Sequence, residues 1–224
     1  MKNRLLVSTI ALLGCAVSAQ ALNVVVVAPI PTTATDFNAI IPIAKFDPAL
    51  GQLLMVTVRL NATLDASLIA ENRSGSPAMI TGSVTNNISL TPPVGPVLSG
   101  SASTSPVGAQ LVGPYDGTPF QNELPNGPFG PDTFRWTIVN GNVDQSNNYV
   151  LPADLAIFTG VGTLNYNVVG DSTFSLSSNT GNLAALATAT AGGTITVTYE
   201  YIPEPATVGL LGMGALALIR RRRR

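Results

Sequence analysis

The sequence predicts an all-β protein whose body is one antiparallel β-sandwich. Several segments alternate apolar and polar residues with period two, the pattern of a strand with one buried face. Turns rich in Gly, Asn and Ser separate these segments, and no stretch between the two termini combines helical periodicity with helix caps. Only 10% of the residues are charged and 46% are hydrophobic, so the chain has enough apolar surface to build a core.

The alternation is clearest from Ala78 to Leu90 and from Thr194 to Tyr201. In the second of these segments, Ile195, Val197 and Tyr199 should line the core while the threonines between them face outward. In chain order, the expected strands are 23–28, 56–60, 78–90, 134–138, 164–168, 174–177 and 194–201. Short strands at this spacing are typical of sandwiches of the immunoglobulin or jelly-roll type.

The segment from Pro92 to Asp132 interrupts this rhythm, because it contains nine prolines and seven glycines. Prolines at this density cannot join the middle of a sheet, so we expect a long loop between two halves of the sandwich. Tyr115, Phe120 and Phe129 either form a binding surface on this loop or anchor it to the sandwich. The second interpretation is favoured.

The N-terminus reads as a secretory signal peptide, residues 1–21. Lys2 and Arg4 precede an apolar run, and Ala19-Gln20-Ala21 is a small-residue site that predicts cleavage by signal peptidase after Ala21. The alternative is a lipoprotein acylated on Cys15, but Leu13 fits that motif poorly.

The C-terminus, residues 203–224, has three parts. Pro203-Glu204-Pro205 precedes a 14-residue apolar run, 206–219, and the chain ends in five arginines. The run is short of the ~20 residues that span a bilayer core, but flanking arginines can reach the lipid headgroups. The arginines themselves stay on the cytoplasmic side. The alternative is a tail anchor that is never cut.

This tail resembles the PEP-CTERM sorting signal of bacterial proteins that an exosortase processes. The resemblance implies a Gram-negative bacterium, a transient anchor in the inner membrane through a short C-terminal helix, and release to a cell surface or matrix rich in exopolysaccharide. The residues expected to carry sorting are Pro203, Glu204, Pro205, Arg220, Arg221, Arg222, Arg223 and Arg224.

A second resemblance concerns the body, residues 22–202. Phe46-Asp47-Pro48-Ala49-Leu50-Gly51 leads through Leu53 into an expected strand, and Glu71-Asn72 and a strand rich in Thr and Ser follow. This arrangement is similar to the exported bacterial domains called choice-of-anchor E. Asp47-Pro48 should begin a turn, Gly51 should tolerate positive φ, and Phe46 and Leu53 should enter the core. The motif therefore has a structural role, and this family implies no chemistry.

The residues also limit the possible functions. The chain has no histidine, and its one cysteine lies in the signal peptide, which excludes Ser-His-Asp, Cys-His and thiol catalysis in the mature protein. We expect no cofactor, metal site or enzymatic activity. Without its terminal segments the body keeps four basic and 11 acidic residues, about −7 in net charge, which disfavours nucleic acid as a partner.

Three function classes remain. The first is a non-enzymatic surface or matrix protein associated with exopolysaccharide. The second is an adhesin that binds carbohydrate or a protein partner through the Pro-rich loop. The third is a secreted glycoside hydrolase, which would need two facing carboxylates. The carboxylates are scattered along the chain and should lie mostly in turns or on the surface.

Overall fold

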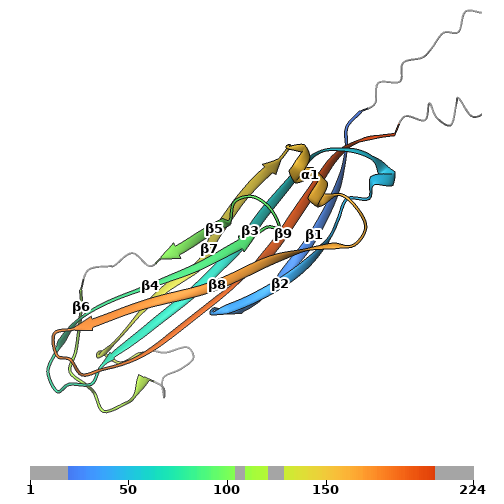
Figure 1. Cartoon of the computed structure of the whole chain (residues 1–224). Coiled ribbons are helices and arrows are strands. Elements are labelled where there is room, and N and C mark those ends of the chain that lie inside the picture. The colour runs from blue at the N-terminus through green and yellow to red at the C-terminus, as the bar shows by residue number, and fades with distance from the viewer. Residues whose placement is uncertain (1–19, 104–108, 121–128, 205–224) are drawn as a thin grey trace, which may run out of the picture.

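The computed structural model of the chain describes residues 20–103, 109–120 and 129–204. In these ranges the chain forms two antiparallel sheets (Figure 1). The strands are β1 (Leu22–Ala34), β2 (Phe37–Ala44), β3 (Gly51–Asn72), β4 (Ala78–Thr91), β5 (Leu98–Ser103), β6 (Gln110–Val112), β7 (Thr133–Tyr149), β8 (Thr163–Ser178) and β9 (Leu183–Pro203). One sheet has the order β1-β9-β3-β7 and the other β2-β8-β4-β5, with β6 also paired to β4.

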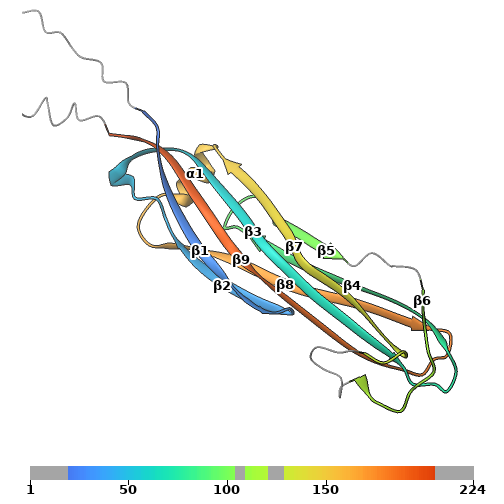
Figure 2. The same cartoon turned by 180° about the vertical axis from the view of Figure 1, so that it is seen from behind.

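The long central pair β3–β9 gives the molecule its elongated shape (Figures 1 and 2). Its register runs from Gly51 opposite Pro203 to Asn72 opposite Leu183. At about 3.3 Å per residue, the 22 residues of β3 span roughly 70 Å. We call the end with Leu22 and Pro203 the terminal end, and the end with Asn72 and Leu183 the far end.

The core fills the space between the two sheets in two clusters. The larger one occupies the terminal half and includes Leu60 and Val197, both fully buried. The smaller one occupies the far half and includes Leu68 and Trp136. Between them lies the buried Asn86 of β4, whose side-chain NH₂ donates to the backbone carbonyls of Asp65 on β3 (3.0 Å) and Thr190 on β9 (2.9 Å). This amide therefore links the two sheets where the apolar core is interrupted.

The motif before β3 has the structural role expected from the sequence. Phe46 and Leu53 are buried at 2% and 8% exposure. The Asp47 carboxylate accepts from the Ala49 N–H and starts the 3₁₀ turn η1 (Pro48–Leu50). Gly51 follows with φ of 140°, and a Cβ built on it would lie 2.1 Å from the carbonyl oxygen of Ile202. Glycine is required here because the last residues of β9 approach this backbone closely.

The all-β prediction and the antiparallel sheets are confirmed, but several boundaries were wrong. The expected strands 164–168 and 174–177 are one strand, β8, and the strand expected at 194–201 begins 11 residues earlier, at Leu183. A short helix, α1 (Pro152–Phe158), was not expected; Pro152 starts it and Phe158 packs its end into the core. The expected loop 92–132 contains the short strands β5 and β6 at its start and middle.

The expected signal helix and the C-terminal apolar run 206–219 lie outside the described residues. Within the described ranges, no helix has the length and apolarity needed to cross a bilayer.

A charge at the centre of the larger core cluster should abolish folding. Val197→Asp places a carboxylate where the wild-type side chain is fully buried, and this should cost more than about 4 kcal/mol, close to the whole stability of a domain. The matched control is Val27→Asp on the neighbouring strand, where the side chain is 58% exposed. Circular dichroism and thermal melting should show a folded control and an unfolded core variant. A folded Val197→Asp protein would contradict this core.

Alkaline pH should weaken the terminal half of the core through Tyr199. Burial raises the pKa of this phenol to about 12 from 10.0, and its hydroxyl donates to the Ala44 carbonyl at 2.7 Å. Because the folded state binds the proton more tightly than the unfolded state, the stabilisation is complete below pH ~10 and is lost as pH rises toward ~12. Denaturant melts across this range should show a steeper loss for wild type than for Tyr199→Phe, and equal slopes would contradict the assignment.

Candidate functional site

The terminal end brings together the two predicted processing sites. Leu22, the first residue of β1, pairs with Tyr201 of β9, so the chain leaves both strands at the same end (Figure 1). Pro203 is the last residue of β9 and pairs with Gly51, while Glu204 follows directly and is exposed. Of the other predicted residues, Ala21 is described and exposed, whereas Ala19, Pro205 and Arg220 to Arg224 lie outside the described residues. No linker separates the sheet from the predicted sorting motif.

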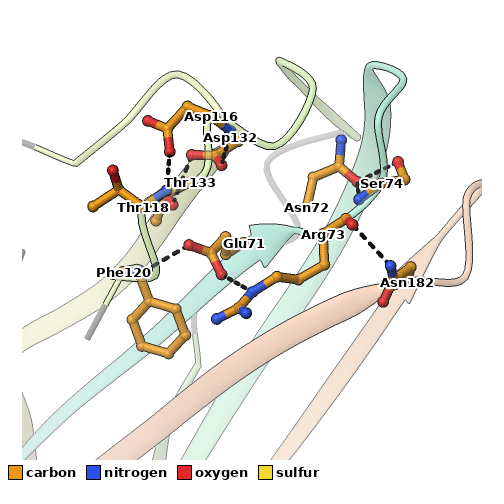
Figure 3. A network of polar contacts seen from close by, with 10 residues as sticks. All are labelled: Glu71, Asn72, Arg73, Ser74, Asp116, Thr118, Phe120, Asp132, Thr133 and Asn182. Carbon is orange, nitrogen blue, oxygen red and sulfur yellow. Dashed lines mark hydrogen bonds and ion pairs between the residues drawn. The ribbon is translucent and has the colours of Figure 1, made fainter. Parts of the chain in front are cut away.

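The far end carries a polar network around the turn from β3 to β4 (Figure 3). Its centre is Glu71, whose carboxylate is fully buried. One carboxylate oxygen accepts from the Phe120 N–H at 2.7 Å, and the other accepts from the Arg73 guanidinium. The guanidinium lies 5.1 Å from the ring centre of Tyr115, a distance suited to a cation–π contact.

The neighbouring Asn72 organises the turn itself. Its side-chain oxygen accepts from both the N–H and the hydroxyl of Ser74, and its NH₂ donates to the carbonyls of Ser76 and Gly113. The buried amide therefore fixes the turn and the segment after β6 at the same time. All these partners satisfy polar atoms that burial would otherwise leave unpaired.

Asp132 and Asp116 hold the segment between β6 and β7. Asp132 is 1% exposed, and its carboxylate accepts from the Asp116 N–H at 3.1 Å and from the Thr133 hydroxyl at 3.3 Å. Asp116 is exposed and accepts from the Thr118 N–H at 2.7 Å. The expectation that most carboxylates lie in turns or on the surface is wrong for Glu71, which is buried at the end of β3, whereas Asp132 lies in a turn but is also buried. Their burial has a physical reason, since the described part of this loop offers them N–H groups to bind.

The aromatic residues of the loop behave as anchors. Phe120 is 1% exposed, Tyr115 is half-buried beneath Arg73, and Phe129 is also half-buried. The interpretation that these residues fix the loop to the sheets agrees with this arrangement. In the described ranges, no group of three or more His, Cys, Asp or Glu side chains is placed to hold a metal ion.

Sequence reasoning missed the network because its members are not a motif. Glu71, Asn72 and Arg73 are adjacent in the chain, but Phe120, Asp132 and Asn182 come from distant segments. The available signal was Glu71 itself, a charged residue at the end of a strand with long apolar alternation.

Comparison with known proteins identifies a sorting motif that begins at the terminal end. Residues 202–224 match the PEP-CTERM protein-sorting motif, which confirms the resemblance of the tail and supports an exported protein that is handled by an exosortase. A search of curated proteins found no match.

Solved structures offer only remote similarity. Two of the matches are particles of infectious bursal disease virus: a T=1 particle (11% identity, 90% of this chain, 48% of that chain, TM-score 0.18) and the T13 particle (12%, 91%, 47% and 0.22). The chain spans about half the length of the solved chains it matches. At these TM-scores the alignments carry no argument about fold or function.

The network makes a stability prediction. Glu71→Gln keeps the size of the side chain but places an NH₂ against the Arg73 guanidinium, so it should cost about 2 kcal/mol and speed amide exchange at residues 115–120. The control is Asp144→Asn, which removes the exposed pair with Arg59 and should leave the melting temperature unchanged. Unfolding curves and hydrogen exchange measure both. Equal behaviour of the two variants would show that the buried carboxylate does not hold the loop.

Proposed function

We propose that the protein is a non-enzymatic surface or matrix protein, exported, held briefly in the inner membrane and then released by an exosortase into an exopolysaccharide-rich layer. The observation that carries the proposal is the match of residues 202–224 to the PEP-CTERM sorting motif, which begins in the last two residues of β9. In this proposal the body is a choice-of-anchor E type domain, and signal peptidase removes residues 1–21.

The position of Pro203 supports processing next to a folded domain. Because β9 runs to Pro203 and Glu204 is exposed, the enzyme would meet an extended segment whose upstream half is already fixed by the sheet. A peptide fixed in extended form loses less conformational entropy on binding. The same geometry keeps the terminal end close to the membrane while the tail is uncut, and it places the far end away from it.

A structural role is also supported by the state of the polar side chains. The two buried carboxylates that lie near each other in the far half, Glu71 and Asp132, both accept hydrogen bonds from the chain itself. A glycosidase needs a pair of carboxylates that face a substrate. Of the loop aromatics, Phe120 is buried, Tyr115 is half-buried against Arg73 and Phe129 is half-buried, so the adhesin alternative has less exposed aromatic surface than the sequence suggested.

Replacing Glu204 should prevent processing. Glu204→Gln removes the charge from the sorting motif but leaves the fold, since the side chain is exposed beyond the last strand. We expect all of the variant to stay in the membrane fraction with its arginine tail, while wild type appears outside the cell without it. Intact-mass analysis of both fractions measures this.

The matched control is Glu200→Gln, which removes a charge four residues earlier in β9 and should be processed like wild type. A released wild-type protein that still carries Arg220–Arg224 would refute cleavage. Release of the Glu204→Gln variant at the wild-type level would show that the glutamate is not read.

A further inference from the structure

The β1–β2 hairpin covers only half of one side of the molecule. β1 pairs with β9 from Tyr201 back to Thr190, and β2 pairs with β8 only from Thr163 to Gly170. The hairpin ends in the turn at Thr35 and Asp36, whose N–H groups donate to the carbonyls of Ala189 and Gly170. Residues 183–189 of β9 and 171–178 of β8 have a ladder partner on one side only within the described chain, and on the other side the turn reaches no farther than Ala189 and Ser172. Both sheets therefore have an open edge on the same side (Figures 1 and 2).

Phe174 shows that the core is uncovered at this side. Along β8, Tyr166 and Val168 face the opposite sheet and are fully buried. Phe174 lies an even number of residues from both, so its side chain faces the opposite sheet as well. It is nevertheless 62% exposed. It lines a cleft of about 460 Å³ that also contains Val84 and Ala187 and lies between the two open edges. A further strand added to the open edge would bury this large, inward-facing aromatic side chain.

The open edge of β9 lacks the usual protection against strand pairing. Residues 183–189 read Leu-Ala-Ala-Leu-Ala-Thr-Ala, with no charge and no proline. Free edges are normally blocked by charged side chains, prolines or bulges. The opposite edge strand of the same sheet, β7, has such features: it carries Arg135 and Asp144, and Asn140 has a left-handed backbone with φ of 54°.

We infer that two copies of the chain associate side by side through these open edges. A two-fold axis between the copies makes β9 pair antiparallel with its equivalent around Leu186, and β8 with its equivalent around Phe174. The far end of each copy then lies beside the β1–β2 turn of the other, so the two half-covered sides fit together. Both Phe174 rings enter a shared core between continuous sheets.

A second copy suits the site better than an isolated peptide. One extended peptide can pair with one sheet edge, whereas a second copy supplies a strand to each sheet at once. The body carries about −7 in net charge, so copies repel over most of their surface. The strip 183–189 is uncharged, which makes it a place where two acidic copies can meet. This inference concerns the body and does not depend on how the tail is processed.

The test is the oligomeric state of the exported protein. Sedimentation velocity and native mass spectrometry should show a dimer of the wild-type chain, with the mass of one copy read from a denatured sample. Ala185→Lys puts a charge on an exposed, inward-facing position of the open β9 edge and should weaken the dimer by about 100-fold or more. Val27→Lys, at an exposed position of the covered half, should leave the dimer intact.

Two further measurements separate loss of the dimer from loss of the fold. Circular dichroism should be unchanged in the Ala185→Lys monomer, because the wild-type residue is already exposed in one copy. Its melting temperature should match that of wild type diluted until it is monomeric, since only the dimer adds to the stability of the wild-type fold. Phe174→Ser, a second variant designed to preserve the fold, should also give a monomer. A wild-type chain that stays monomeric at high concentration, or an Ala185→Lys chain that dimerises like wild type, would overturn the inference.

Discussion

The antiparallel pairing of β3 with β9 is the constraint on which the rest of the structure depends. These strands pair from Gly51 opposite Pro203 to Asn72 opposite Leu183, and β1 and β7 attach to their outer sides. A slip of one residue would turn every buried side chain of the pair toward solvent, so the alternation of apolar residues fixes the register. The same register decides that the chain enters and leaves at one end, and that the turn with Glu71 lies at the other.

The fold class and the sorting motif at the terminal end could be predicted from the sequence, because both have strong local signals. Alternation over Ala78–Leu90 and Thr194–Tyr201 marks buried strands, and the proline-glutamate-proline tail is recognisable without a structure. The missed strands have weak signals: β5 consists mainly of Ser, Gly and Ala, and β2 contains a proline. The first half of β9 is Ala and Thr with little apolar contrast, so only its pairing with β3 reveals it.

The far-end network was outside the reach of sequence reasoning for a different reason. Its hydrogen bonds join residues separated by up to 109 positions. The burial of the Glu71 carboxylate depends on its two partners, the Phe120 N–H and the Arg73 guanidinium, and the fold has to place both beside it. A buried charge without such partners would destabilise the fold, so this carboxylate requires an ordered loop next to it. The two ends thus differ in kind. One carries the start of the sorting motif, and the other uses polar groups to hold a proline-rich segment against the sheets.

The common exit of both strands at the terminal end has a mechanical consequence. Tension applied between Leu22 and Pro203 would peel β1 from β9, because the strands leave side by side and their hydrogen bonds would break one after another. Tension between Pro203 and the far end runs along the strands instead, so that many bonds of the β3–β9 ladder resist together in shear. A chain held at its C-terminal side and pulled at the far end is therefore loaded in its stronger direction.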